Sequence, residues 1–283
     1  MMYPYHNLYT MYVESVILRT KNKEAMVKYY TLALGLSIIK EDGAYIHLGT
    51  STGRVLVRLL LDPQATVQNG TVGLYHFALL LPNRRDLATF LHHYVETGYT
   101  FIGASDHSVS EALYLEDPEG NGIEIYVDRP DTEWKKMGSG VFMDTRRLDV
   151  NRLLQERDPS GFKGVPQDTI MGHIHLHVAT IAKAQKFFVD ILGFKLMLTY
   201  GDQAIFTSDS GYHHHIGLNT WHNDPLPTNK KITGLFGYHL HVPLDRKTTF
   251  FNQLVDKGIN LQSDGQYVMF HDINGSLILI KED

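Results

Sequence analysis

Hydrophobic and polar residues follow the same order in four segments of the chain. Each segment opens with a run typical of a β-strand, and these runs are VESVILRT, LYHFALLLP, HIHLHVATI and GYHLHVPL. A helical pattern of about a dozen residues follows each run, and it ends at Gly35, Gly98, Gly193 and Gly258. Glycine suits the left-handed residue that closes a helix. Shorter runs separated by turn residues come next and predict hairpins. The pattern therefore predicts four βαβββ modules.

The spacing of the modules predicts how they are grouped. They occupy residues 12–66, 70–128, 168–222 and 233–283, and residues 129–167 separate the second from the third. This segment contains several glycines and prolines, which indicates a linker, with a short helix at 150–156. A solenoid would space its modules evenly. We therefore expect an N-terminal domain at 1–128 and a C-terminal domain at 168–283. Because one module cannot bury both faces of its sheet, the modules should combine in pairs.

Composition and charge narrow the classes of function. The 283 residues, 43% of them hydrophobic, are sufficient for a large buried core. The net charge of -5 and the scattered Lys and Arg argue against a nucleic-acid or membrane-surface partner. No apolar window approaches a membrane span and the first residues do not resemble a signal peptide, so we expect a cytoplasmic protein. The chain has no cysteine, so a metal would be bound through nitrogen and oxygen, and the 16 histidines become candidate ligands.

The module plan and several motifs resemble a known superfamily. The sequences LALGL, DILGF, GLYHFALLLP, SEALYLEDPEGNGIEIY, GHIHLH and GYHHHIGLN resemble those of the vicinal-oxygen-chelate superfamily of glyoxalases, bleomycin-resistance proteins and extradiol dioxygenases. The nearest likeness is to two-domain bacterial catechol 2,3-dioxygenase-like proteins. The resemblance implies an α+β fold in which paired half-barrels enclose a metal site supplied by the first and last strands of the modules. It also implies an Fe(II)-dependent extradiol dioxygenase acting with O2 on a catechol-like or hydroquinone-like aromatic.

The repeat locates the metal positions that the resemblance implies. Counting back from the helix-closing glycines by a nearly constant interval gives Ser15, His76, His173 and Gly237. Aligning DPEGN with DINGS in the last strands places Glu124 opposite Leu279. The first module offers the apolar run around Val57, and the third offers the three histidines at 213–215. Modules one and four therefore have no ligand at these positions.

His76, Glu124 and His173 form the predicted metal set. Two neutral imidazoles and one carboxylate on one face of an ion leave other positions open, which suits non-haem Fe(II), with Mn(II) as an alternative. A carboxylate inside a barrel would be unfavourable without a cation beside it. Each residue alone is more often structural, but their shared repeat position favours a metal site. His175 and His177 share the face of His173, and we expect them to form hydrogen bonds inside the barrel.

The resemblance also implies residues that act on the substrate. His215 matches the acid–base histidine of extradiol dioxygenases, and an imidazole that titrates near neutrality can take a proton from a catechol. The sequence leaves open which of residues 213–215 faces the site. Tyr114 stands ten residues before Glu124 and matches a hydrogen-bond donor to a substrate oxygen, with a core aromatic as the alternative. His107 resembles a second substrate-contacting histidine, although its spacing favours a structural role.

The distribution of ligands predicts which modules pair. In the best-known ring-cleaving enzymes all three ligands come from modules three and four, but the fourth module here supplies neither the histidine nor the glutamate. Glu124 and His173 can share one ion only if module two pairs with module three, which leaves module one to pair with module four. Some members of the superfamily pair their modules in such permuted ways.

Two other classes of function stay open. One is a glyoxalase-like metal-dependent isomerase or thiol transferase, which His215 disfavours because that class usually has a second carboxylate at the fourth position. The other is a metal-free protein that sequesters a small molecule, which the three retained ligands disfavour. A homo-oligomer is compatible with the sequence, which does not determine the oligomeric state.

Overall fold

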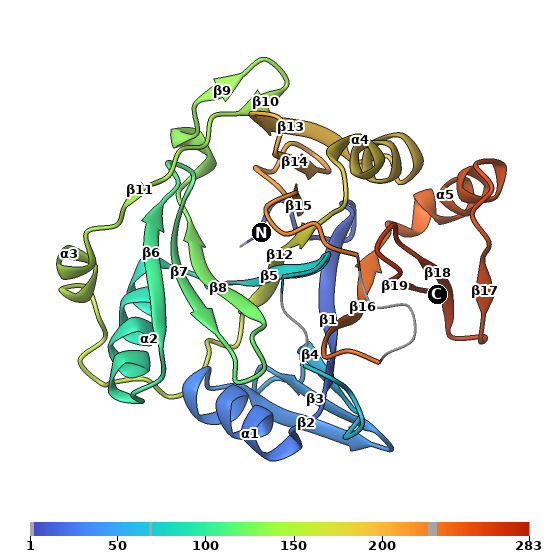
Figure 1. Ribbon diagram of the computed structural model, residues 1–283. Coiled ribbons are helices and arrows are strands. Elements are labelled where there is room, and N and C mark those ends of the chain that lie inside the picture. Colours follow the sequence, from blue (N-terminus) through green and yellow to red (C-terminus); the bar gives the residue numbers. More distant parts are fainter. Residues whose placement is uncertain (1–2, 68–69, 226–230, 283) are drawn as a thin grey trace.

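The computed structural model describes residues 3–67, 70–225 and 231–282. The four modules lie in sequence order, and Figure 1 shows them from blue to red. Module one consists of β1 (Tyr12–Thr20), α1 (Lys23–Lys28), the π-helical turn η1 (Tyr29–Ala33), β2 (Ser37–Asp42), β3 (Tyr45–Gly49) and β4 (Val55–Leu61). Module two consists of β5 (Gly73–Leu80), α2 (Arg84–Glu96), β6 (Phe101–Asp106), β7 (Ser110–Glu116) and β8 (Gly122–Asp128).

The second half of the chain repeats this order. Module three consists of β12 (Ile170–His177), α4 (Ile181–Gln185), the π-helical turn η3 (Lys186–Ile191), β13 (Lys195–Tyr200), β14 (Ala204–Ser208) and β15 (Ile216–Asn219). Module four consists of β16 (Gly234–His241), α5 (Leu244–Asp256), β17 (Gln262–Ser263), β18 (Tyr267–His271) and β19 (Leu277–Lys281). The helix-closing glycines all have the expected left-handed backbone, with φ of +72° at Gly35, +75° at Gly98, +85° at Gly193 and +80° at Gly258. These positions therefore require glycine, as predicted.

Two sheets join the modules across the halves of the sequence. One sheet has the order β11-β6-β7-β8-β5-β12-β15-β14-β13 and combines modules two and three. The other has the order β17-β18-β19-β16-β1-β4-β3-β2 and combines modules four and one. In Figure 1 the first sheet curls around the upper left of the molecule, with α2 and α4 outside it, and the second lies at the lower right. The expected α+β half-barrel fold and the expected pairing of modules are confirmed.

The segment between the second and third modules is more structured than a plain linker. It contains a 3-10 turn, η2 (Asp131–Glu133), the short strands β9 (Lys136–Met137), β10 (Gly140–Val141) and β11 (Arg146–Arg147), and α3 (Val150–Leu154). The helix begins at the predicted residue, and β11 extends the nine-stranded sheet beside β6. Each sheet takes one module from each half of the sequence, so the sheets do not follow the division at 1–128 and 168–283. That division into domains stays a prediction.

One face of each sheet carries the hydrophobic core. Phe77 of β5 and Ile174 of β12 are fully buried, in the same cluster as Leu18 of β1 and Tyr238 of β16. Tyr30 of η1 stacks on Phe77, with ring centroids 6.4 Å apart, so the two sheets share this core. Burying each large apolar side chain contributes about 1.5–3 kcal/mol. Strand alternation sends the neighbours of these residues to the opposite face, where the candidate site lies.

No helix in the described part of the chain is long and apolar enough to cross a membrane.

A close approach between β12 and β8 fixes the position of the strand beside the site. The pairing of β12 with β5 shifts register between Met171 and His173, and Gly172 lies at this irregularity. A Cβ atom on Gly172 would lie 1.9 Å from the hydroxyl oxygen of Tyr126. Tyr126 is fully buried, and its hydroxyl lies 2.6 Å from that of Tyr212. The phenol therefore has no room to move, and only glycine fits opposite it.

Replacing Gly172 with alanine should destabilise the protein by about 1–3 kcal/mol, because the added methyl group overpacks the contact with Tyr126. The free energy of unfolding from urea titrations measures this loss. Gly103→Ala is the matched control, since nothing lies within 4 Å of its added Cβ. Equal stability of the two variants would contradict the proposed close contact.

Candidate metal centre

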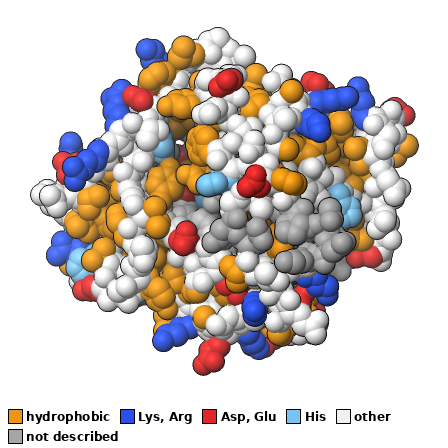
Figure 2. Space-filling view, in the orientation of Figure 1, with side chains coloured by type: hydrophobic (Ala, Val, Ile, Leu, Met, Phe, Trp, Pro, Cys, Tyr) orange, Lys and Arg blue, Asp and Glu red, His pale blue; other side chains and the backbone are white. Residues whose placement is uncertain are grey.

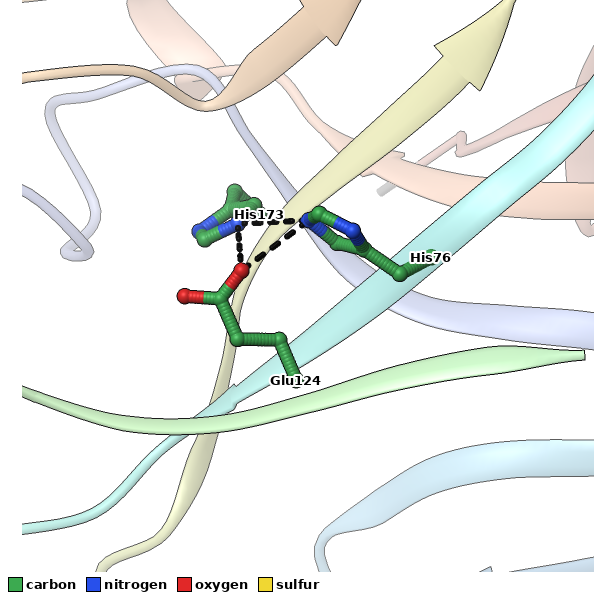
Figure 3. Close-up of side chains that lie close together, drawn as sticks. All are labelled: His76, Glu124 and His173. Carbon is green, nitrogen blue, oxygen red and sulfur yellow. Dashed lines mark hydrogen bonds and ion pairs between the residues drawn. The ribbon is translucent and has the colours of Figure 1, made fainter. Parts of the chain in front are cut away.

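Three neighbouring strands position His76, Glu124 and His173. His76 lies on β5, Glu124 on β8 and His173 on β12, and β5 is the central strand of the three. Glu124 is level with Ala78 of β5, and Ala78 is level with His173 of β12. The three side chains therefore leave their strands at nearly the same level and on the same face. Figure 3 shows them converging from these strands.

The donor atoms of the three side chains lie close together. Nε2 of His76 lies 3.0 Å from Oε2 of Glu124, and Nε2 of His173 lies 3.4 Å from the same oxygen. The two Nε2 atoms are 3.3 Å apart. Ligands bound at about 2.1 Å and at right angles around one ion are separated by about 3.0 Å. The spacing therefore fits three ligands on one face of a metal ion.

Burial makes this arrangement costly without a cation. The exposed fractions are 5% for His76, 3% for Glu124 and 1% for His173. Burial raises the pKa of Glu124, but the flanking histidines, His173 foremost, outweigh burial and hold the pKa well below its ordinary value. Burial lowers the pKa of His173 to about 4, despite the nearby Glu124 carboxylate. A charged carboxylate beside a neutral imidazole at neutral pH is the donor set that a divalent metal requires.

A pocket of about 880 Å³ opens beside the cluster, and His76 and Glu124 line it. This volume lies within the range of small-molecule sites. Much of the wall is aromatic or imidazole, formed by Tyr75, His175, His177, Phe206, His214 and Trp221. Near the middle of the face in Figure 2, histidine side chains lie among hydrophobic ones. The pocket therefore offers apolar rings close to the candidate metal centre.

The structure brings Tyr114 and His107 into this pocket together. Tyr114 lies on β7, directly opposite Glu124 of β8. Nδ1 of His107 lies 2.9 Å from the carbonyl oxygen of Asp144, so this nitrogen donates, and Nε2 accepts a 2.6 Å hydrogen bond from the Tyr114 hydroxyl. Burial, followed by the charge of Glu124, raises the pKa of Tyr114 well above its ordinary value. Tyr114 therefore stays protonated, and His107 fixes its orientation.

The structure corrects the position expected for His215. Nδ1 of His215 accepts from the backbone N–H of Asp209 at 3.1 Å, and Nε2 donates to the carbonyl oxygen of Tyr5 at 3.0 Å. Both ring nitrogens are thus occupied, and His214 lines the pocket instead. The ring of His214 lies 4.1 Å from that of His173, centroid to centroid. The three histidines precede β15 and do not lie within it. Strand alternation therefore does not decide which of them faces the site.

Comparisons with known proteins identify the superfamily of this chain. A model of the Glyoxalase/Bleomycin resistance protein/Dioxygenase superfamily matches residues 12–125. The catechol-2,3-dioxygenase of Bacillus subtilis (strain 168) is 42% identical over 233 residues, which are 80% of this chain and 81% of that protein. The chain belongs to this superfamily. Biphenyl-2,3-diol 1,2-dioxygenase 3 of Rhodococcus globerulus is 30% identical over 115 residues, 40% of this chain and 60% of that protein.

Solved structures of low sequence identity share the superfamily's fold. A structure from Bacillus subtilis subsp. subtilis strain 168 has a TM-score of 0.65 at 12% identity, covering 97% of this chain and 86% of that one. Glyoxalase I from Zea mays has a TM-score of 0.57 at 14% identity, covering 96% and 92%. At this identity the likeness concerns the fold alone. The family model and the 42% identity to the catechol-2,3-dioxygenase confirm the superfamily expected from the motifs.

Sequence patterns missed the N-terminal segment, which packs against the metal-bearing strands. His6 lies within hydrogen-bond distance of the carbonyl oxygen of Gly172, at 2.7 Å from Nε2. The carbonyl of Tyr5 accepts from His215, and the backbone N–H of Met11 donates to Asp209 at 2.7 Å. These residues carry no strand or helix pattern before β1. Their contacts explain why His215 is held in a structural position away from the pocket.

The two further histidines of β12 form hydrogen bonds, as expected. Nδ1 of His177 donates to Oδ1 of Asn219 at 2.6 Å, and Nδ2 of Asn219 donates to Nε2 of His175 at 3.0 Å. Burial lowers the pKa of His177 to about 4. His177 is therefore neutral in the folded protein at neutral pH but binds a proton below pH 6.5 when the chain is unfolded.

This difference predicts a pH-dependent loss of stability. The contribution of His177 is fully present above about pH 6.5 and is lost as the pH falls toward 4, with a slope of at most about 1.4 kcal/mol per pH unit. His177→Gln keeps a donor for Asn219 but removes the titrating ring, so its stability should fall less steeply over this range. Urea unfolding at pH 7, 6 and 5 measures both slopes. Parallel curves for the two proteins would contradict the assignment of a depressed pKa to His177.

Proposed function

We propose that this protein is an Fe(II)-dependent extradiol dioxygenase that opens catechol-like rings, with His76, Glu124 and His173 as the metal ligands. The observation that carries the proposal is the convergence of their three donor atoms beside a pocket that also contains Tyr114 and His214. The 42% identity to a catechol-2,3-dioxygenase supports the same chemistry. The substrates are then an aromatic diol and O2.

The residues present fit a divalent metal with open coordination positions. The ligand set is two imidazoles and one carboxylate, which is the facial set of non-haem Fe(II) oxygenases, and Mn(II) accepts the same donors. When bound, the ion supplies a centre at which both oxygens of a catechol and O2 can coordinate. Nδ1 of His76 and of His173 has no hydrogen-bond partner among the described residues. Packing therefore holds these rings in place, without the usual second hydrogen bond.

We infer that His214, which lines the pocket, would accept the catechol proton. Oδ1 of Asp128 lies 2.9 Å from Nε2 of His213, and a ring with its proton on Nε2 alone presents a lone pair at Nδ1. That nitrogen lies 2.8 Å from Nδ1 of His214, which donates to it when His213 is in this tautomer. The remaining nitrogen of His214, Nε2, is then unprotonated. This chain of hydrogen bonds sets the tautomer that a general base requires.

Tyr114 and His107 would position the substrate. The Tyr114 hydroxyl lies in the pocket beside Glu124 and donates a hydrogen bond to Nε2 of His107. A lone pair of its oxygen is thus available to accept from a substrate hydroxyl. The hydrogen bond to His107 fixes the position of the phenol. His107 would act through Tyr114 as a positioning residue. Aromatic walls around Tyr75 and Trp221 would stack on the ring of the substrate and exclude water.

The geometry supports the alternatives less well. A glyoxalase-like site with a second carboxylate would draw on the last strand of module three, but Gly217 of β15 pairs with His175 at the level corresponding to Glu124. Among the described residues the metal cluster contains three ligands. A metal-free sequestering protein would leave a buried carboxylate and two histidines without a role.

The proposal is tested by reconstituting the protein anaerobically with Fe(II) or Mn(II), one ion at a time, and adding catechol and O2. We expect oxygen uptake with a yellow ring-opened product, identified by mass spectrometry as substrate plus two oxygen atoms. Isomerisation of a hemithioacetal in the absence of oxygen uptake would favour the glyoxalase-like alternative. If the protein shows neither this isomerisation nor oxygen uptake with any member of a panel of substituted catechols, the proposed reaction is overturned.

The ligand set predicts the metal content of variants. His76→Ala, Glu124→Ala and His173→Ala should each reduce bound metal from about one ion per chain to near zero, because two remaining donors cannot hold it. Inductively coupled plasma mass spectrometry measures the content. His175→Ala is the matched control, because this buried histidine lies on the same strand face and is bonded to Asn219. Full occupancy in any of the three variants would exclude that residue as a ligand.

The histidine run predicts different effects for two adjacent residues. His214→Gln should keep the metal but lower kcat by about 10²- to 10⁴-fold, the usual contribution of a general base. His215→Gln should keep turnover within a few-fold while lowering the melting temperature, because it weakens the contact with Tyr5. Steady-state kinetics at matched metal content separates the two effects. A larger loss of kcat in the His215 variant would return the catalytic role to that residue.

A further inference from the structure

The eight-stranded sheet has positions equivalent to those of the candidate metal ligands, and a cationic side chain stands where Glu124 would be. In the nine-stranded sheet His76 is level with His175, and Ala78 is level with both His173 and Glu124. In the eight-stranded sheet the corresponding rows are Ser15 with His239, and Ile17 with both Gly237 and Arg58. Superposing the two registers places Ser15 at the position of His76, Gly237 at that of His173 and Arg58 at that of Glu124.

Arg58 repeats the contact that Glu124 makes, with the charge reversed. Glu124 lies beside His76, and the Arg58 guanidinium donates through Nη1 to the Ser15 hydroxyl. His47 of β3 is level with Arg58, as Tyr114 of β7 is level with Glu124. The eight-stranded sheet therefore repeats the layout of the candidate metal centre with an arginine where the carboxylate would be.

This face of the eight-stranded sheet is partly open to solvent. The exposed fraction alternates along β3 and β18, and the half-buried residues Tyr45, His47, Arg58 and Tyr267 share the face. Ser15 and His239 are buried at its base, with exposed fractions of 1% and 6%. A ligand could therefore reach the guanidinium, while Ser15 and His239 lie beneath it.

The cation of Arg58 is poorly compensated by protein charges. No carboxylate in residues 3–67, 70–225 and 231–282 lies within 4.0 Å of its guanidinium nitrogens. Glu14, the carboxylate that acts on it, is shared with His241 at 3.7 Å. Burial accordingly lowers the pKa of Arg58. Burial, followed by the charge of Arg58, lowers the pKa of His239 to about 3. A partly buried cation of this kind is stabilised by an anion.

We propose that Arg58, oriented by the Ser15 hydroxyl, binds a small oxyanion, a carboxylate or a phosphate, in the barrel that lacks the metal ligands. The guanidinium presents several N–H donors in a planar fork that matches two oxygens of such a group. The buried Ser15 hydroxyl accepts from Nη1 of Arg58 and so orients the guanidinium from beneath. The rings of His239 and Tyr267, 5.0 Å apart, provide an aromatic wall beside it. The site is separate from the proposed reaction and does not depend on it.

Titration of the holoprotein with inorganic phosphate and, separately, with benzoate tests this proposal. Sodium chloride at the same ionic strength corrects for screening. We expect at least one of the two anions to raise the melting temperature in a saturable way. Arg58→Met should weaken the apparent affinity by at least about tenfold, and Arg58→Lys, which keeps the charge without the fork, should give an intermediate value. Arg152→Met, at an exposed arginine of α3, is the matched control and should bind as the wild type does.

Two further comparisons keep the outcome unambiguous. Glu124→Ala should retain the Arg58-dependent shift, because the anion does not bind at the candidate metal centre. Circular dichroism verifies that Arg58→Met is folded, and isothermal titration calorimetry then measures its affinity directly. A response to phosphate alone or to benzoate alone supports the site and identifies the class of ligand. No saturable response from the wild type, or equal affinity in wild type and Arg58→Met, would overturn the proposal.

Discussion

The antiparallel pairing of β5 with β12 is the contact on which the candidate metal centre depends. Three donor atoms can bind one ion only when they lie about 3 Å apart. His76 and His173 are 97 residues apart in the sequence, so only strand pairing brings them together. The backbone ladder brings Ala78 level with His173, and the parallel ladder to β8 brings Glu124 to the same level. The shift of register at Gly172, held against Tyr126, sets the level of His173.

Burying this cluster opposes folding unless other groups compensate for it. A carboxylate and two histidines, nearly inaccessible to water, lose hydration that only each other or a cation can replace. Around them the protein supplies hydrogen bonds selectively, since Asn219 serves His175 and His177, and the N-terminal segment serves His215. Nδ1 of His76 and Nδ1 of His173, on the two candidate histidine ligands, have no such partner among the described residues.

The two barrels show how one scaffold can hold opposite chemistry. The strand registers of the two sheets correspond around Glu124 and Arg58, because the same backbone ladders generate both. A ladder fixes where a side chain leaves the backbone but not its charge. One barrel can therefore gather donors for a cation while the other presents a guanidinium. The sequence predicts the apolar run around Val57 at the position equivalent to Glu124, and the structure has Arg58, the next residue, there. An alternating strand pattern does not by itself fix the pairing register.

The sequence by itself determined the modules and the helix-closing glycines, because periodicity and repeat spacing are local properties of the chain. The repeat and the family resemblance together predicted the set His76, Glu124 and His173, whose donor atoms lie together in the structure. Even the pairing of modules two and three followed from it, since only that pairing gathers the set in one cavity. The tertiary structure alone decided that His214 and not His215 lines the pocket. The histidine run precedes its strand, so contacts with Tyr5 and Asp128, remote in sequence, orient its rings. Such orientations depend on long-range packing, which no local pattern encodes.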